Sequence, residues 1–346
     1  MKKLNVLFFP LGPIEVPSSR YRVYQFLAPL RAHGVGSRVR LGCPSAGLLD
    51  RVAYAARIGA DLVWADVVFL QKAFPPPKVM RLIRASGKPV VFDLDDTIWS
   101  ENTSLREHRD EGREAKGKRF LEAIGRECDL VIAGNDYLAS IVVPSNPRVV
   151  VLPTVLDTDL WCPGAGRESD IVTIGWIGTR DNLYYLKALD PVFRALGKSR
   201  NGRVVLKIIC DRPYEVAGGE IEVVNEKWAL KTEVELLASC DIGIMPLTDD
   251  EWTRGKCGFK VIQYMAMGMP AVASAVGANR EIVDDAINGF LVSSVREWFE
   301  RLSQLIESRD LRDTIGRAAR AKIVAQYSVR GATERFVSVL EQAAGR

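Results

Sequence analysis

Residues 245–289 read MPLTDDEWTRGKCGFKVIQYMAMGMPAVASAVGANREIVDDAING, and this stretch is the most informative about the fold class. It predicts a helix that begins near Cys257 or Gly258, because apolar residues then recur at three- and four-residue spacings along one face. A short apolar strand that ends at Ser274 comes next, and a second, short helix begins near Asn279. This order of strand, helix and strand is typical of a parallel α/β sheet.

The same alternation runs through the whole sequence and predicts β-α-β units. A break at 152–169, rich in proline and glycine, divides the strand candidates into two sets of six. The sequence therefore predicts two doubly wound, Rossmann-like α/β domains that face each other across a cleft. The first set of strands is predicted at Leu4–Phe9, Arg38–Leu41, Val67–Leu70, Pro89–Phe92, Leu130–Ala133 and Val149–Leu152; the second set at Ile171–Ile177, Val204–Cys210, Ile221–Val224, Asp241–Met245, Ala271–Ser274 and Phe290–Val292.

The domain boundaries follow from this break. We expect one domain at residues 1–165 and a second at residues 166–328. Three helices are predicted at the end of the sequence, at Val295–Ser308, Leu311–Tyr327 and Val329–Ala344. We expect the last segment, 329–346, to pack back on the first domain.

Composition excludes several classes of protein. The 346 residues carry 47 basic and 43 acidic side chains that are interleaved along the chain, so no nucleic-acid partner is indicated. The six cysteines never form a C-x-x-C pair, which favours reduced thiols in a cytoplasmic protein without a metal site. No apolar run reaches the length of a membrane span, and MKKLNVLFFPLG reads as a first strand rather than a signal peptide.

The start of the predicted helix has the features of an anion site. Gly255 and Gly258 would let a ligand approach the backbone, and a helix N-terminus presents free N–H groups. Lys256, Lys260 and Gln263 follow at i, i+4 and i+7 and would form one polar stripe. We interpret the lysines as a diphosphate grip and Gln263 as a ribose contact. An amphipathic helix with a solvated lysine stripe is the alternative.

A second helix N-terminus is predicted to point at the same place. Gly277 opens the loop after the preceding strand, and Asn279, Arg280 and Glu281 stand at the start of the short helix. Glu281 is either an acceptor for sugar hydroxyls or a favourable acid in a first helical turn. Two adjacent helix starts favour the ligand site over the solvated helix.

This segment resembles the donor-binding half of the group 1 (family four) glycosyltransferases, which have the GT-B fold. Further pieces are similar to that family: Ser19, Arg20 and Arg22 after the glycine- and proline-rich loop that follows the first strand, and IGWIGTR at Ile174–Arg180. The residues that match the family's main pattern are Gly258, Gln263–Ala266, Gly268–Pro270, Val272–Ser274, Gly277, Glu281 and Asn288–Phe290.

The resemblance implies a transferase that moves a sugar from a nucleoside diphosphate sugar (UDP, GDP or ADP type) to an acceptor hydroxyl. It implies retention and no bound cofactor or metal, in bacterial-type synthesis of cell-surface polysaccharide or glycoconjugate. The first domain would hold a glycan or lipid-linked acceptor and the second the donor, in a cytoplasmic protein or one bound to the inner membrane face. Catalytic roles fall to Lys260, Lys256 and Arg180; donor binding to Gly12, Arg20, Gly178, Thr179, Arg254, Gly258, Phe259, Gln263, Gly277, Asn279 and Glu281.

The sequence departs from the family at two positions. The family usually has two glutamates seven residues apart, and Gly255 and Gln263 stand there in this chain. A glutamine still binds a ribose, but a glycine does not replace a carboxylate near the sugar. A substitute carboxylate would come from 249–251 (DDE), and a relative that binds nucleotide without transferring sugar is a further alternative.

A competing motif lies at 90–99, VVFDLDDTIW, which resembles the first motif of haloacid-dehalogenase-like phosphatases. Asp93 would then be a nucleophile that attacks a phosphoryl group with magnesium, and Asp95 the acid. That family carries the motif on its first strand, whereas about four elements precede it here. The charged stretch 101–119 leaves two interpretations open: a solvated surface and a contact with anionic lipid.

Overall fold

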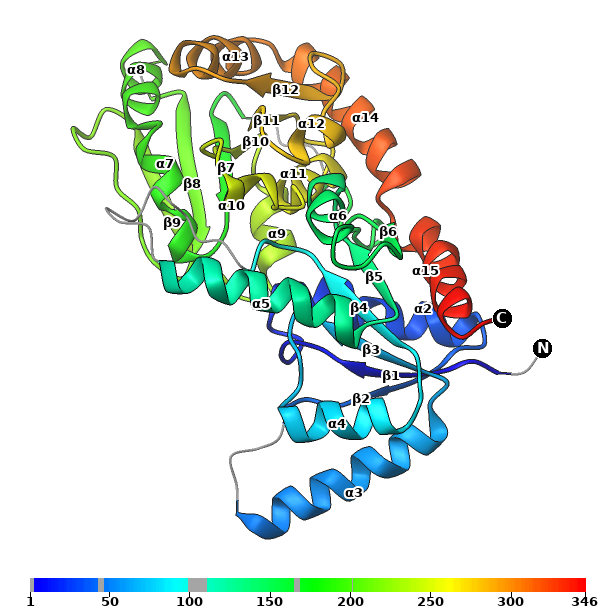
Figure 1. Ribbon diagram of the computed structural model, residues 1–346. Helices are drawn as coiled ribbons and strands as arrows, with labels where there is room; N and C mark the ends of the chain where they lie inside the picture. Colours follow the sequence, from blue (N-terminus) through cyan, green and yellow to red (C-terminus); the bar gives the residue numbers. More distant parts are fainter. Residues whose placement is uncertain (1–2, 43–46, 99–110, 165–168, 201) are drawn as a thin grey trace. The chain divides into compact units, whose positions relative to one another are not determined.

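The computed structural model describes residues 3–42, 47–98, 111–164, 169–200 and 202–346 (Figure 1). Contacts divide the chain into two compact units. The first domain comprises Met1–Val155, Gly255–Cys257 and Val329–Arg346, and the second comprises Leu156–Arg254 and Gly258–Ser328. Among the described residues, no helix is long and apolar enough to cross a membrane.

The first domain is built on a six-stranded sheet in which all neighbouring strands are parallel. Its order is β2-β1-β3-β4-β5-β6. The chain leaves β1 toward β2 on one side and resumes with β3 on the other, so the switch point lies between β1 and β3. The strands are β1 (Asn5–Phe9), β2 (Gly36–Val39), β3 (Val67–Gln71), β4 (Val90–Leu94), β5 (Leu130–Ala133) and β6 (Val149–Val151).

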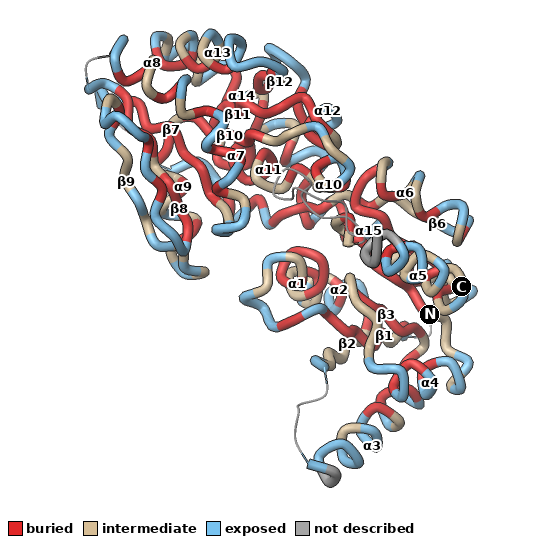
Figure 2. The backbone as a smooth tube through the Cα atoms, turned by 60° about the vertical axis from the view of Figure 1, so that its left-hand side comes forward, coloured by how far each residue is buried: buried red, intermediate tan, exposed pale blue. Residues whose placement is uncertain are grey.

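Amphipathic helices cover this sheet. β3 (Figure 2) and β4 are buried along their whole length, as a parallel sheet between helices requires. The last helix belongs here too: Phe336 packs against Phe26 and Phe69, with ring centroids 4.9 and 5.4 Å apart. The helices are α1 (Pro17–Arg22), α2 (Leu27–Ala32), α3 (Leu48–Trp64), α4 (Pro77–Ala85), α5 (Glu111–Glu127), α6 (Asp136–Val142) and α15 (Val329–Ala343).

The second domain repeats the plan with a second parallel six-stranded sheet of order β12-β11-β10-β7-β8-β9. Its switch point lies between β7 and β10, and ligands of such sheets bind beyond the carboxyl ends of the strands at that point. The strands are β7 (Val172–Ile177), β8 (Val204–Cys210), β9 (Glu222–Lys227), β10 (Ile242–Met245), β11 (Ala271–Ser274) and β12 (Gly289–Val292). The two sheets confirm the predicted α/β fold class.

Three helices of this domain begin at a side-chain cap or at a glycine. Ser294 and Glu297 form a reciprocal capping box at the start of α13, and Ser308 caps α14 through the N–H of Leu311. α11 begins after a glycine, as described below. The elements are a 3₁₀ turn (Arg180–Asn182), α7 (Tyr184–Lys187), α8 (Asp190–Arg200), α9 (Glu233–Ala238), α10 (Glu251–Arg254), α11 (Phe259–Ala266), α12 (Asn279–Ile282), α13 (Val295–Glu307) and α14 (Arg309–Gln326).

Gly243, in the middle of β10, allows α11 to pack closely on the sheet. A Cβ atom at Gly243 would lie 2.1 Å from Cγ of Tyr264, a buried residue whose hydroxyl donates to the carbonyl of Ile244. We expect Gly243→Ala to lower the free energy of unfolding of this domain by about 1–3 kcal/mol through overpacking. Urea unfolding measures it. Gly164→Ala is the control, since a Cβ there makes an ordinary contact at 3.5 Å; equal losses in both variants would contradict the prediction.

Candidate donor site and an adjoining cavity

The helix that was predicted to bind the diphosphate begins one or two residues further along the chain than expected. Gly258 is its N-cap, in the left-handed region with φ of 63°, and α11 starts at Phe259. Lys256 therefore precedes the helix and, by its contacts, groups with the first domain. Gln263 lies on α11 but is buried, with 4% of its surface exposed. The predicted stripe of Lys256, Lys260 and Gln263 on one exposed helix face is thus wrong.

The starts of α11 and α12 do meet, as two neighbouring helix starts were expected to do. A Cβ atom at Gly258 would lie 3.3 Å from Oδ1 of Asn279. Gly277, with φ of 50°, approaches the carbonyl of Arg254 so closely that a Cβ would lie 2.7 Å from it. Asn279 is buried and donates from Nδ2 to the carbonyl of Ser274 at 2.9 Å. Its Oδ1 finds no hydrogen-bond donor among the described residues.

Lys260 extends from α11 to the end of β7. Its Nζ lies 5.6 Å from the centroid of the Trp176 ring, and a Cβ at Gly178 would lie 2.9 Å from its Cε. The loops after β7, β10 and β11 therefore converge at the switch point around Gly178, Lys260 and Gly258. This places a cation and glycine-lined backbone together, which is the chemistry that an oxyanion needs.

The remaining predicted residues of the second domain lie around this convergence. Thr179 and Arg180 follow Gly178; the Arg180 N–H donates to Asp211 at 3.2 Å, and its guanidinium lies 4.0 Å from the same carboxylate. Arg254 pairs with Asp249 at 2.7 Å. Phe259 is half-buried at the first position of α11, and Glu281 is exposed on α12.

In the first domain, the predicted residues Gly12 and Arg20 hold a loop together. The N–H of Gly12 donates to the Ser19 hydroxyl at 3.0 Å, and that hydroxyl donates to Gln71. Arg20 is 8% exposed and donates to the carbonyl of Ile14 at 3.2 Å. These contacts fix the loop that follows β1, at the switch point of the first sheet.

The aspartates of 90–99 form ion pairs at the end of β4, buried at Asp93 and partly buried at Asp95 and Asp96, and Trp99 lies outside the described residues. Arg22 contacts Asp93 at 2.5 Å, and both side chains are at most 3% exposed. Burial raises the pKa of the Asp93 carboxyl, and Arg22 opposes this shift. A phosphatase nucleophile must be reached by its substrate, whereas Asp93 is enclosed.

Lys72 joins the two carboxylates that follow. Its Nζ lies 3.4 Å from Asp95 and 3.3 Å from Asp96, and its backbone has a left-handed φ of 62°. Burial alone would raise the pKa of Asp95, but Lys72, Ser18 and Arg22 hold it below its usual value. Burial also raises the pKa of the neighbouring Cys257 thiol to about 12, which keeps it protonated at neutral pH. The described residues include no group of three or more side chains suited to a metal ion.

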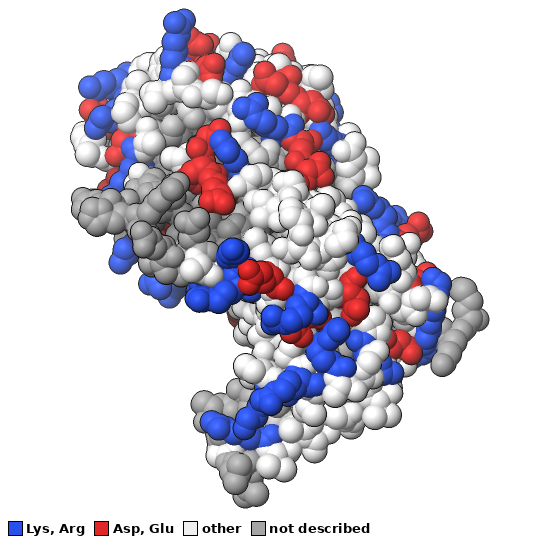
Figure 3. Space-filling view, viewed as in Figure 1, with Lys and Arg blue, Asp and Glu red and all other residues white. Residues whose placement is uncertain are grey.

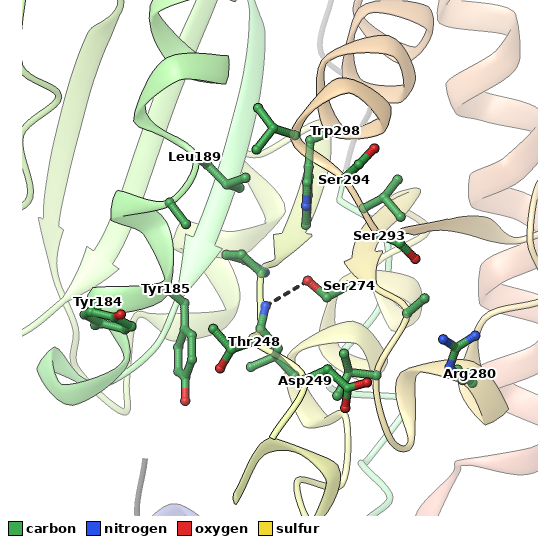
Figure 4. A pocket seen from close by; sticks show the side chains of 17 residues that line it. Tyr184, Tyr185, Leu189, Thr248, Asp249, Ser274, Arg280, Ser293, Ser294 and Trp298 are labelled. Atoms are coloured by element: carbon green, nitrogen blue, oxygen red, sulfur yellow. Dashed lines mark hydrogen bonds between the residues drawn. The ribbon is translucent and has the colours of Figure 1, made fainter. Parts of the chain in front are cut away.

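A cavity of about 410 Å³ lies within the second domain, and it shares the loops after β10 and β11 with the site around Gly178, Lys260 and Gly258 (Figure 4). Its wall runs from α7 across the loops after β10, β11 and β12 to the first turns of α13, and Ser274 accepts a hydrogen bond from the N–H of Leu247 at 2.9 Å. The lining residues are Tyr184, Tyr185, Ala188, Leu189, Pro246–Asp249, Ser274–Val276, Arg280, Val292–Val295 and Trp298.

This cavity was not predicted from the sequence. Of its lining residues, Asp249 had been named as a substitute carboxylate and Arg280 as a helix-start residue, but Tyr185, Ser274 and Trp298 had no assigned role. The available signal was position: polar residues directly after β10, β11 and β12 stand at the carboxyl edge of a parallel sheet. The aromatic residues come from helices, where they are also typical of the core.

Comparison with known proteins agrees with the geometry. Residues 168–308 match the family described as "Glycosyl transferases group 1". A curated relative, spore coat protein SA of Bacillus subtilis (strain 168), is 26% identical over 81 residues, and the match spans 22% of this chain and 22% of that relative.

Two solved structures have the same architecture over nearly the whole chain. Anabaena Alr3699/HepE in complex with UDP and glucose is 16% identical, with a TM-score of 0.67 over 98% of this chain and 100% of that one. Sucrose-phosphate synthase from Thermosynechococcus elongatus is 13% identical, with a TM-score of 0.70 over 98% and 99%. At such identities the likeness shows the fold, which is GT-B. Residues 168–308 thus match the group 1 glycosyltransferase family that the sequence resembles, and the chain has the GT-B fold.

Proposed function

We propose that the protein transfers a glycosyl group from a nucleoside diphosphate sugar to a hydroxyl group of an acceptor. The observation that carries the proposal is the convergence of Gly178, Lys260 and Gly258 at the switch point of the second sheet. The family match of residues 168–308 covers all three loops that meet there.

The proposed chemistry is electrostatic. When the bond between the sugar and the diphosphate breaks, negative charge grows on the leaving oxygen, and preorganised cations and N–H groups stabilise it. Lys260 supplies a cation over the end of β7, and the exposed guanidinium of Arg180 follows in the next turn. Lys256 groups with the first domain by its contacts, so the proposal rests on Lys260 and Arg180.

We propose a UDP sugar as the donor and retention as the outcome. Support for UDP comes from similar proteins: Alr3699/HepE was solved with UDP-glucose, and an Escherichia coli protein described as "Trehalose-6-phosphate" was solved bound with UDP-2-fluoro glucose. The acceptor is proposed to be a glycan or a lipid-linked sugar in the synthesis of cell-surface polysaccharide.

A lipid-linked acceptor would bring the protein to a membrane surface, and the first domain has a suitable feature. Basic side chains gather over α4 on the face shown in Figure 3, where Lys78, Arg81 and Arg84 are exposed. Basic groups near an anionic leaflet are worth about 1 kcal/mol each. We propose peripheral contact through α4. Lipid contact was also considered for the stretch 101–119, but its first ten residues, 101–110, lie outside the described residues.

Thermal unfolding with UDP, GDP and ADP tests the donor. UDP at a hundredfold excess over its dissociation constant should stabilise the donor domain by about 2.7 kcal/mol, because it binds only the folded state. GDP and ADP should give smaller shifts at the same concentration. Absence of a shift with all three nucleotides would contradict the proposal. A UDP shift without sugar transfer or donor hydrolysis would instead indicate a binding-only relative.

A further inference from the structure

The cavity between α7 and α13 has side chains to which no role has been given. Its inner wall is formed by Tyr185, Leu189, Val292 and Trp298, each at most 5% exposed. Its rim carries Arg280 and residues of the loops after β10 and β12. A volume of about 410 Å³ falls within the range of small-molecule sites, roughly 300–1,000 Å³.

Hydrogen-bond donors predominate on this wall. In Figure 4 the indole nitrogen of Trp298 lies on the edge of the ring that faces Ser274. Within the described ranges, this nitrogen, the Tyr184 hydroxyl, the Ser293 hydroxyl and the Arg280 guanidinium make no hydrogen bond or ion pair. Each of these groups can donate a hydrogen bond to a ligand oxygen.

The cavity also has a surplus of positive charge. Its lining includes one acidic residue, Asp249, and one basic residue, Arg280. The Asp249 carboxylate is already paired with Arg254 at 2.7 Å, outside the lining, so the Arg280 charge is not balanced within the cavity. The hydrogen-bond donors of the lining and the planar guanidinium of Arg280 suit a ligand that is rich in oxygen and carries a carboxylate.

The cavity and the grip share two loops. In the loop after β11, Ser274 lines the cavity while its carbonyl accepts from Asn279 at the grip. In the loop after β10, Asp249 lines the cavity and binds Arg254, whose carbonyl contacts Gly277. A ligand held by its diphosphate at the grip therefore has the cavity beside it.

We propose that this cavity receives the transferred sugar and that the sugar is a hexuronic acid, with its carboxylate on Arg280. This inference rests on the proposed function. In the transfer, the bond from sugar C1 to the diphosphate oxygen breaks and leaves UDP. A new bond forms between C1 and the acceptor oxygen, and the acceptor's proton is released. The rings of Tyr185 and Trp298, which line the cavity, offer apolar surface to the sugar's C–H groups.

Calorimetric titration of the full chain with UDP, UDP-glucose and UDP-glucuronate tests the inference. UDP-glucuronate should bind at least about tenfold more tightly than UDP-glucose, because one charge-assisted bond is gained. Arg280→Gln should abolish this preference and leave UDP binding unchanged. Trp298→Phe, which keeps an aromatic ring but removes the N–H donor, should weaken both sugar nucleotides relative to UDP. Arg309→Gln is the control, because Arg309 lies outside the cavity lining and is 57% exposed.

The outcomes separate the two proposals. Equal affinities for the two sugar nucleotides in the unaltered chain, or a preference that survives Arg280→Gln, would overturn the uronate inference while UDP binding keeps the proposed function. Failure of all three ligands to bind would overturn the proposed function itself. Circular dichroism of each variant shows that a lost preference does not come from misfolding.

Discussion

Asp93→Asn is expected to lower the free energy of unfolding of the first domain by roughly 3–5 kcal/mol. The substitution removes the negative partner of Arg22 and leaves a cation enclosed, with 3% of its side chain exposed. Breaking a buried ion pair by removing one partner has this cost because the remaining charge keeps its desolvation penalty. Chemical denaturation followed by tryptophan fluorescence and circular dichroism measures it.

A double substitution sharpens this test. Arg22→Met together with Asp93→Leu removes both charges and should recover much of the stability lost in Asp93→Asn. Recovery will be incomplete, since Arg22 also donates to the carbonyl of Leu152 at 2.9 Å. Asp136→Asn, at an exposed carboxylate in the first turn of α6, is the matched control and should change stability by a few tenths of a kcal/mol. If Asp93→Asn left stability intact and abolished a magnesium-dependent phosphatase activity, the phosphatase interpretation would be right.

Lys260→Ala is expected to weaken nucleotide binding roughly 10- to 100-fold. A charge-assisted hydrogen bond contributes about 1.5–3 kcal/mol, and each 1.4 kcal/mol is a factor of ten. The fold should tolerate the change, because Lys260 is half-buried at the first turn of α11 and alanine is a good helix former. Sugar transfer should fall at least as much as binding, since the charge on the leaving diphosphate is greatest after the bond has broken.

The control for Lys260 is a lysine of the same domain. Lys198→Ala removes an exposed cation on α8 that pairs with Glu220 at 3.3 Å, and it should leave UDP affinity unchanged. An unchanged UDP affinity in Lys260→Ala would remove this residue from the proposed grip. A loss of equal size in both variants would point to a general effect of net charge instead.

The strands were the most predictable part of the fold. Val204–Cys210, Leu130–Ala133 and Ala271–Ser274 were predicted at their observed bounds, because a buried strand of a parallel sheet is a short apolar run between polar turns. β9 was less well placed: predicted at Ile221–Val224, it extends to Lys227. It is an edge strand with exposed polar residues, so hydrophobicity does not mark its end.

Helices with weaker patterns were harder to predict. α3 was not predicted, and its exposed positions include Val52 and Val63, at 60% and 85% exposure, so apolar residues do not mark one face. α4 is short and begins within a run of prolines, which reads as a loop. In α3 the hydrophobic pattern differs too little between the buried and the exposed face to predict a helix.

The site was predictable where its residues lie close together in the sequence. Gly258 and Lys260 were identified, but Lys256 and Gln263 were predicted to share a polar stripe on the helix, whereas Lys256 precedes the helix and Gln263 is buried. The left-handed cap at Gly258 shifts the helix start, and no spacing rule reveals that. The cavity residues Tyr185 and Trp298 are more than a hundred positions apart, so only the folded sheet brings them to one wall.

The packing of Phe336 on Phe26 and Phe69 bears on how the protein is made by a ribosome. The core that begins with β1 includes a helix from the opposite end of the chain, so the emerging N-terminal segment cannot bury all its aromatic surface by itself. The second domain is continuous apart from Gly255–Cys257 and can form as soon as Ser328 has emerged. Because synthesis runs from the N- to the C-terminus, the core of the second domain can be completed before the core of the first domain.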